Sequence, residues 1–231
     1  MKIEILFPEI CNLYGDLGNV MLIEKTLTNA TIIKTTILDE PYFAKHKVNF
    51  IYMGPMSPNN QKLVIEKLMP YKDKIKKMIN DGVVFLFTGN ALEIMGKEII
   101  EDDNSKVKAL DIFKVTSKID ELNRYHSLFL GKLKDVNAPI VGYFCQSSKS
   151  TIKEKSLFEV VKQLEGNKGE GIRVNNFFAT NLLGPILVLN PYFAKYLFSL
   201  IKYNKPLYLE TELIDAYNKR LAEYENDNIK L

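Results

Sequence analysis

The sequence contains no tryptophan, only two cysteines and only two histidines among its 231 residues. The two thiols, Cys11 and Cys145, lie far apart in the chain, so neither the clustered ligands of a zinc site nor a framework of disulfides is present. Such sparse cysteine usage fits a reducing compartment. We therefore expect a cytoplasmic protein with no metal and no cofactor.

An excess of one charge and long apolar runs are also absent. Lys and Arg number 31 against 28 Asp and Glu, and this net charge of +3 is too balanced to indicate nucleic acid as a partner. No stretch approaches the roughly 18 apolar residues of a membrane-spanning helix. The apolar part of the opening MKIEILFPEI is too short for a signal peptide. We expect neither a nucleic-acid partner nor a membrane span.

Strand and helix patterns alternate through the first hundred residues. Six segments carry the alternation, with strands expected at 3–7, 32–38, 48–53 and 83–87 and helices at 18–27 and 59–80. Pro70 should break the second helix, because proline has no N–H to donate inside a helix. Alternation of this kind builds a parallel sheet with crossover helices. The predicted fold class is therefore α/β, with a mostly parallel sheet flanked by helices.

After Gly96 the pattern changes to short segments, which predicts an extra β region. Strands are expected at 107–115, 128–133 and 139–144, with a polar stretch at 117–124, and further apolar segments at 172–179 and 182–189. Helices at 191–203 and 207–225 should close the chain, and residues 215–231 should form a helical tail that frays. No linker or repeat interrupts the chain, so we expect one domain over residues 1–231.

The stretch from Asp81 to Gly96, DGVVFLFTGNALEIMG, is the most informative part of the sequence. Its apolar run Val83–Phe87 predicts a fully buried parallel strand, and a short amphipathic segment follows directly after Thr88-Gly89-Asn90. A strand, a sharp glycine turn and a helix are the geometry of a nucleophile elbow. We place Thr88 at its tip. A threonine without a nearby histidine is a poor nucleophile, so the expected chemistry is missing there.

Other motifs occur in an order and spacing typical of one family. They are FPEICNLYGDLGN at 7–19, YMGP at 52–55 followed by Gln61, FTGN at 87–90, VGYFCQ at 141–146, GEG at 169–171 and NLLGP at 181–185. Together they resemble the class I glutamine amidotransferases of the cobyric acid synthase type, over residues 1 to about 205. The opening segment resembles that of the glutaminase subunits of lipid II isoglutaminyl synthases. The resemblance implies a flavodoxin-like fold.

The resemblance also implies a mechanism whose residues are replaced in this chain. In the family, a cysteine at the elbow attacks the side-chain amide of glutamine, and a histidine before Gly-Pro activates it. The matching positions here are Thr88 and Leu183, and leucine cannot accept a proton. Gly54-Pro55 stands in the oxyanion loop, where proline removes one backbone N–H donor. These replacements predict an inactive glutaminase site.

The remaining positions of the predicted cleft also differ in part from the family pattern. The cleft is expected to contain Gly54, Gln61, Gly89 and Asn90, with Asn90 in place of the second glycine of the elbow. Cys145-Gln146 stands where the family has Asn-His. His46 and His126 are expected to have surface or packing roles, and a Cys145–His126 dyad is the weaker reading, because a free cysteine usually acts as a small apolar residue.

Three functions follow as hypotheses. By the resemblance, the chain is a non-catalytic partner or regulator of an ATP-dependent amidating enzyme, a Mur-ligase-like subunit. Alternatively, it is an active amidotransferase that uses an unconventional nucleophile such as Thr88 or Cys145. The third hypothesis is a binding module that holds a glutamine-like small molecule in the cleft at the strand ends.

Overall fold

The computed structural model of the protein describes residues 1–162 and 168–226. The helices, in chain order, are α1 (Leu17–Thr26), α2 (Pro58–Leu68), α3 (Lys72–Asn80), α4 (Ala91–Ile94), α5 (Ile186–Leu189), α6 (Pro191–Leu200) and α7 (Glu210–Glu225). Short 3₁₀ turns cover Leu13–Gly15, Tyr42–Ala44 and Met69–Tyr71. The strands are β1 (Lys2–Leu6), β2 (Thr31–Thr35), β3 (Phe50–Met53), β4 (Val84–Thr88), β5 (Glu98–Ile100), β6 (Lys106–Lys108), β7 (Val115–Ile119), β8 (Tyr125–Lys132), β9 (Pro139–Gln146), β10 (Ser148–Ile152), β11 (Phe158–Lys162), β12 (Gly169–Glu170), β13 (Ile172–Val174) and β14 (Phe177–Thr180).

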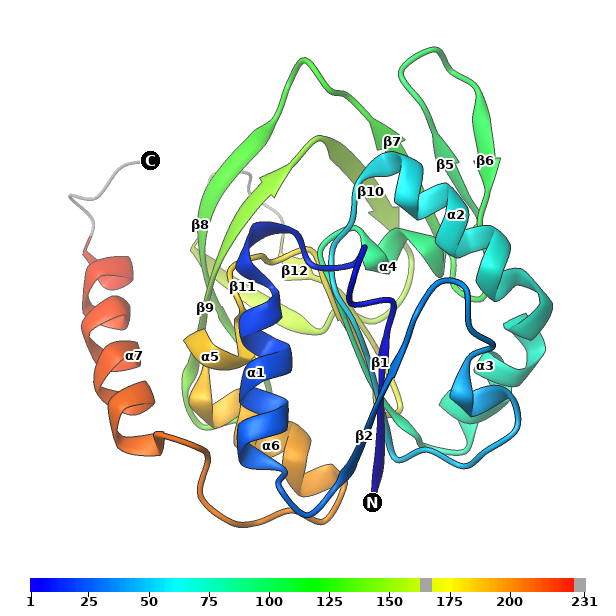
Figure 1. Cartoon of the computed structure of the whole chain (residues 1–231). Helices are drawn as coiled ribbons and strands as arrows, with labels where there is room; N and C mark the ends of the chain where they lie inside the picture. The colour runs from blue at the N-terminus through cyan, green and yellow to red at the C-terminus, as the bar shows by residue number, and fades with distance from the viewer. Residues whose placement is uncertain (163–167, 227–231) are drawn as a thin grey trace.

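A mostly parallel sheet lies at the centre of the fold (Figure 1). Its strand order in the described residues is β13-β14-β4-β3-β1-β2, and every pair is parallel except β13 with β14. The parallel part has the order of flavodoxin-like folds, in which ligands bind at the carboxyl ends of the strands, beside the point where the strand order reverses. The predicted α/β class is confirmed, and the topology directs attention to the ends of β1, β3 and β4.

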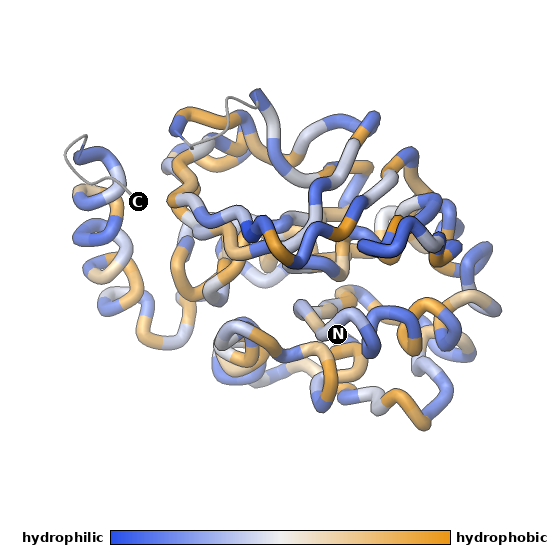
Figure 2. The backbone as a smooth tube through the Cα atoms, turned by 90° about the horizontal axis from the view of Figure 1, so that it is seen from above, coloured by the Kyte–Doolittle hydropathy of each residue, from blue (hydrophilic) through white to orange (hydrophobic). Residues whose placement is uncertain are grey.

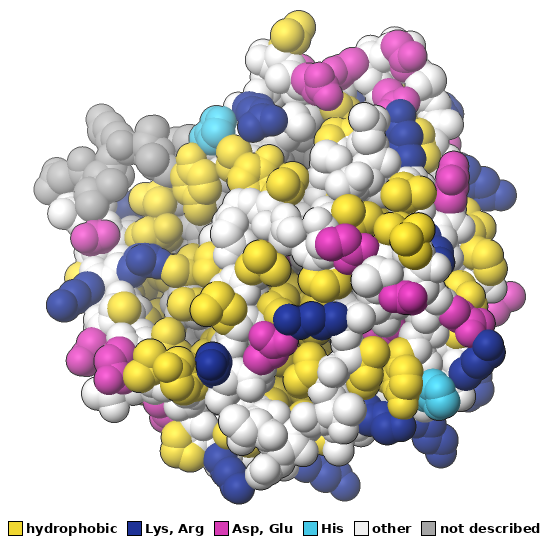
Figure 3. Space-filling view, viewed as in Figure 1, with side chains coloured by type: hydrophobic (Ala, Val, Ile, Leu, Met, Phe, Trp, Pro, Cys, Tyr) yellow, Lys and Arg dark blue, Asp and Glu magenta, His cyan; other side chains and the backbone are white. Residues whose placement is uncertain are grey.

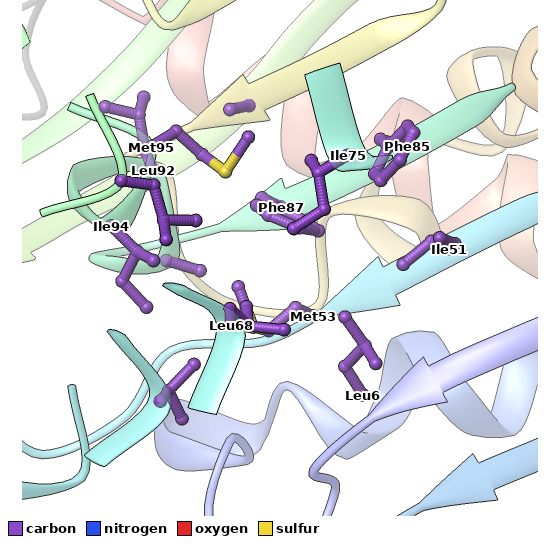
Figure 4. Close-up of a cluster of buried hydrophobic side chains, with 14 of the residues drawn as sticks. Leu6, Ile51, Met53, Leu68, Ile75, Phe85, Phe87, Leu92, Ile94 and Met95 are labelled. Atoms are coloured by element: carbon purple, nitrogen blue, oxygen red, sulfur yellow. The ribbon is translucent and has the colours of Figure 1, made fainter. Parts of the chain in front are cut away.

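Both faces of this sheet are buried, as the continuous apolar runs predict. Alternate residues of β4 enter two clusters, with Phe85 and Phe87 on the α2–α3 face and Val84 and Leu86 on the α1–α6 face. Figure 4 shows the first cluster, in which Phe85 and Phe87 lie among side chains of the neighbouring strands and helices. The strand β4 is therefore buried between two helical layers, one on each face of the sheet.

The expected extra β region is present as two further sheets. Within the described ranges, their strand orders are β10-β7-β5-β6 and β12-β11-β8-β9. Figures 1 and 2 show these strands beside the central sheet, with α7 packed outside β8 and β9. Tyr217 of α7 is buried, and its hydroxyl donates a hydrogen bond of 2.8 Å to the carbonyl of Pro139.

Several element boundaries differ from the sequence prediction. The break at Pro70 is confirmed by the 3₁₀ turn between α2 and α3. The strand expected at 107–115 is wrong, since residues 109–114 lie outside any strand and Asp111 has a left-handed backbone (φ 51°). Residues 115–119 form β7 by pairing with β5 and β10, so the expected polar stretch at 117–124 begins inside a strand.

The C-terminal region agrees only in part with expectation. The apolar segment 172–179 is two strands, joined by a turn at Asn175 (φ 52°). The expected tail is helical up to Glu225, and its last part, 227–231, lies outside the described residues. No helix in the described ranges is long and apolar enough to cross a membrane.

Candidate functional site

The predicted elbow forms between β4 and α4, but the residue at its turn is Gly89. Thr88 is the last residue of β4 and has no exposed surface. Gly89 follows with φ 57°, the left-handed conformation that costs a residue with a side chain about 1–2 kcal/mol. The residue at the tip of the turn is therefore Gly89, one position after the predicted Thr88, and it has no side chain to act as a nucleophile.

Thr88 instead belongs to a buried polar network on the α1 side of the sheet. Its Oγ1 donates to Oδ2 of Asp16 over 2.8 Å, and the hydroxyl of Tyr52 donates to the same carboxylate oxygen. Asn19 Nδ2 donates to the other oxygen of Asp16 over 3.0 Å, while Asn19 Oδ1 accepts from the backbone N–H of Leu187 over 2.8 Å. The network ties β3, β4, α1 and α5 together beneath the elbow.

Asp16 is the titratable carboxyl group of this network and is only 1% exposed. Its removal from water raises the pKa of Asp16 to about 7, although the hydrogen bonds from Thr88 and Asn19 lower it. A carboxyl group at this position would be a suitable base for the Thr88 hydroxyl. Thr88, however, is absent from the lining of the cleft, so a substrate in the cleft would not meet its oxygen.

The loop after β3, the predicted oxyanion loop, offers few hydrogen-bond donors. Gly54 is buried beneath the cleft, where an added Cβ would lie 2.5 Å from the carbonyl oxygen of Cys11 and 2.7 Å from Oδ2 of Asp16. Pro55 has no N–H. The next N–H, that of Met56, donates to Asn90 Oδ1 over 3.0 Å, and Asn90 Nδ2 donates back to the Met56 carbonyl over 2.9 Å. The N–H of Met56 is thus bonded to Asn90 and is not free to stabilise an oxyanion.

Leu183, the predicted base position, lies directly against the elbow. A Cβ added to Gly89 would lie 3.0 Å from Leu183 Cδ2 and 2.6 Å from Cβ of Pro55. The backbone N–H of Leu183 donates to the carbonyl of Tyr143 over 2.8 Å, which fixes the segment after β14 against β9. The structure therefore brings together Gly89, Pro55 and Leu183, and their apolar atoms fill the space around the tip.

An open cleft of about 380 Å³ lies over these residues at the carboxyl ends of the strands. Its volume is within the range of small-molecule sites. Gln61, Gly89 and Asn90 line it as predicted, whereas Gly54 does not. Gln61 Nε2 donates to the carbonyl of Asn90 over 2.9 Å and to Glu93 Oε2 over 3.0 Å.

Glu93 is a second buried carboxyl group, which the sequence did not reveal as part of the site. It is 2% exposed, and burial raises its pKa, opposed by hydrogen bonds from Ser148 and Gln61. The only local sign of this role in the sequence was that Glu93 is a charged residue one turn after the elbow, in an otherwise apolar segment. Glu170 is similarly buried, at 6% exposure, and accepts from Thr180 Oγ1 over 2.7 Å. Burial raises the pKa of Glu170 to about 7.

Cys145 and His126 are cross-strand partners in the pairing of β8 with β9. Cys145 lines the cleft, while His126 is exposed and its Nδ1 lies 3.1 Å from the hydroxyl of Tyr143. The imidazole thus has a partner other than the thiol. His46 is exposed and stacks on Tyr42, with ring centroids 4.2 Å apart. No cluster of potential metal ligands occurs among the residues that the structure describes.

Comparison with known proteins agrees with this geometry. Residues 2–190 match the family model of the CobB/CobQ-like glutamine amidotransferase domain. The chain is 24% identical over 204 residues to the GatD subunit of the glutamine-hydrolysing lipid II isoglutaminyl synthase of Streptococcus pneumoniae, covering 82% of this chain and 76% of that protein. It is 26% identical over 214 residues to the GatD subunit of Staphylococcus aureus, covering 88% of this chain and 85% of that protein.

Solved structures show the same fold at low sequence identity. A glutamine amidotransferase crystal structure superimposes with a TM-score of 0.56 at 12% identity, covering 87% of this chain and 99% of the other. A glutamine amidotransferase from Thermotoga maritima gives 0.53 at 10% identity, with 98% and 99% covered. PurLQS from the same organism gives 0.53 at 11% identity, with 95% and 98% covered.

Proposed function

The chain belongs to the CobB/CobQ-like glutamine amidotransferase family, and we propose that it is a member without glutaminase activity. Its role would be that of a non-catalytic partner or regulator of an ATP-dependent, Mur-ligase-like amidating enzyme. The observation that carries the proposal is the elbow itself, where Gly89 faces Leu183 at the position of a nucleophile and its base. The relatives above are subunits of a larger enzyme, which supports a subunit role.

Hydrolysis of the glutamine amide by the family mechanism would need three groups that the elbow and the segments against it do not supply. A nucleophile must attack the amide carbon, but the side chain at the tip is missing in Gly89. A base must take the proton of the nucleophile, but Leu183 is aliphatic. Donors must stabilise the oxyanion, but Pro55 has no N–H and the N–H of Met56 is bonded to Asn90. Each loss alone would slow the reaction, and together they leave no route for it through the elbow.

A surface suited to a partner lies beside the cleft. Four large apolar side chains are exposed on the 3₁₀ turn and α1, namely Leu13 (36%), Tyr14 (47%), Leu17 (44%) and Met21 (60%). Leu17 and Met21 are four residues apart and so share one face of the helix. Figure 3 shows apolar side chains on the face of the molecule that carries α1. We call these four residues the apolar stripe, and its exposure supports a docking role.

The decisive experiment is an assay of ammonia release from glutamine. We expect no release above background from the wild type, Thr88→Ala or Cys145→Ala, with the GatD subunit of Streptococcus pneumoniae as the positive control. Release by the wild type that persists in both variants would refute the loss of activity, and release lost in one variant would identify the nucleophile. The Cys145 outcome is the second candidate function, because this thiol lines the cleft. Thermal stabilisation by glutamine without product would instead support a binding module.

A further inference from the structure

A second and larger hollow lies away from the cleft. It is an open groove of about 1,000 Å³ formed by the loop between β8 and β9, the segment before β11 and the turn after β13. The β8–β9 pairing runs from Tyr125 opposite Gln146, beside the cleft, to Lys132 opposite Pro139, beside the groove. β14 likewise runs from the groove end towards Asn181 in the cleft. The groove is therefore at the opposite end of these strands, which Figure 1 shows running side by side, and none of the described residues lines both hollows.

The lining of this groove is strongly basic, so we call it the basic groove. Its charged side chains are five cations and two carboxylates, namely Lys132, Lys134, Lys155, Lys168 and Arg173 against Asp135 and Glu159. The resulting net charge of +3 equals that of the whole 231-residue chain. The chain is nearly balanced elsewhere, so its excess positive charge is concentrated at one hollow, where it creates a local field that attracts anions.

Arg173 is held rigidly at the wall of the basic groove. Its guanidinium forms an ion pair with Asp135 and donates to the hydroxyl of Tyr196 over 2.7 Å. It also lies over the ring of Phe178, 5.3 Å from the centroid. Arg173 is the main partner of Asp135 and lowers the pKa of that carboxyl group, and Lys134 and Lys155 lower it further through their charge. The ion pair with Arg173 thus largely balances the charge of Asp135.

The four lysines of the basic groove are exposed and available. No ammonium group among them forms an ion pair within the described part of the chain. Glu159 lies opposite Lys132 in the β11–β8 pairing, yet no ion pair joins them. Unpaired ammonium groups around one hollow repel each other, and an anion bound between them would relieve this repulsion.

Neutral donors and an apolar floor complete the site. Ser156, Asn137 and Asn175 line the basic groove with hydroxyl and amide groups, and Leu157 and Phe158 lie at its base, buried. Ser156 packs directly over Gly169, where any added Cβ would clash with its Oγ. Such a mixture of cations, hydrogen-bond donors and apolar surface suits an organic molecule that carries phosphate groups.

We propose that the basic groove binds a ligand with a diphosphate group, whose organic part lies on the floor formed by Leu157 and Phe158. A diphosphate carries roughly three negative charges near neutral pH, which matches the charge of the lining. Lysines bind phosphate oxygens as point charges, and the four lysines of the lining supply such charges. This site is independent of the glutamine cleft and of the proposed function.

The test is a calorimetric titration of the full chain with inorganic pyrophosphate, and separately with ADP. The groove variant Lys134→Glu/Lys155→Glu reverses two charges in the basic groove. The α3 variant Lys74→Glu/Lys76→Glu is the control, because it changes the net charge by the same amount at exposed positions outside the groove. We expect saturable binding by the wild type and the α3 variant, and binding at least tenfold weaker in the groove variant. ADP should bind at least as tightly as pyrophosphate, because its organic part adds contact with the floor.

Three results would overturn this proposal. The first is that neither pyrophosphate nor ADP binds the wild type, and the second is that all three proteins bind them with equal affinity. The third is that a hexaglutamate peptide binds the wild type more tightly than pyrophosphate and ADP do, which would indicate an acidic protein segment as the ligand. Urea midpoints of the three proteins establish that each is folded. If the groove variant does not fold, Lys134→Gln/Lys155→Gln removes the same charges with smaller side-chain changes and is expected to weaken binding in the same way.

Discussion

The crowded turn at Gly89 gives a quantitative prediction for Gly89→Ala. A Cβ at this position would lie 2.6 Å from Cβ of Pro55 and 3.0 Å from Cδ2 of Leu183, in a backbone with φ 57°. The left-handed conformation costs about 1–2 kcal/mol for a residue with a side chain. Overpacking against a buried proline and leucine adds about 1–3 kcal/mol. We expect Gly89→Ala to lower the free energy of unfolding by about 2–5 kcal/mol.

Gly15→Ala is the matched control, because Gly15 also has a left-handed backbone (φ 76°) but nothing within 4 Å of an added Cβ. It should lose only the conformational part, about 1–2 kcal/mol. Urea unfolding of the wild type and both variants measures the difference directly. Equal losses in the two variants would show that Pro55 and Leu183 do not crowd the elbow. A cysteine nucleophile would then fit at the tip without rearrangement, and the steric part of our reasoning would be refuted.

Two further predictions concern the buried acids and the partner surface. Burial raises the pKa of Asp16 and of Glu170 to about 7, above their ordinary values of 3.8 and 4.5. The native state therefore binds more protons than the unfolded state between these values. The free energy of unfolding should fall as the pH rises from about 4 to about 7. Urea midpoints at pH 5 and pH 8 should differ in this direction, and Asp16→Asn should reduce the difference; an unchanged difference would contradict the assignment to Asp16. The second prediction is tested by co-purification with a co-expressed Mur-type ligase of the same organism. Leu17→Glu/Met21→Glu should reduce recovery of the complex at least tenfold. Leu63→Glu on α2 should not, although Leu63 is as exposed as Leu17, at 44%. Equal recovery of the ligase with both variants would exclude the apolar stripe as the docking surface.

The buried network around Asp16 connects this stability argument with the proposed loss of glutaminase activity. Thr88, Tyr52 and Asn19 all bond to one carboxyl group, and Asn19 also bonds to the backbone of α5. The network thus holds α1, which carries the apolar stripe, against the strands beneath the cleft. In the proposed member without glutaminase activity, such a network would preserve the shape of the surface rather than support a reaction.

Local patterns in the sequence determined the elements and the class of fold. The run Val83–Phe87 is apolar at every position, which specifies a strand buried on both faces, and Gly89 permits the left-handed turn after it. Pro70 ended a helix for an equally local reason. Where polar residues alternate in short strands, as in β10, pairing with neighbours decided the structure, and the sequence pattern predicted no strand there.

The arrangement of the site was decided only by tertiary structure. Leu183 meets Gly89 because β14 pairs with β4 in parallel, a contact between segments more than ninety residues apart. The period of two along β4 places Thr88 on the same face as Leu86, towards α1. Only the folded chain shows that Asp16 lies there and accepts the hydrogen bond of Thr88. The basic groove likewise collects lysines from separate segments of the sequence. Periodicity and turn residues act over a few positions, whereas contacts between distant segments depend on how whole elements pack, and that packing determines which side chains meet.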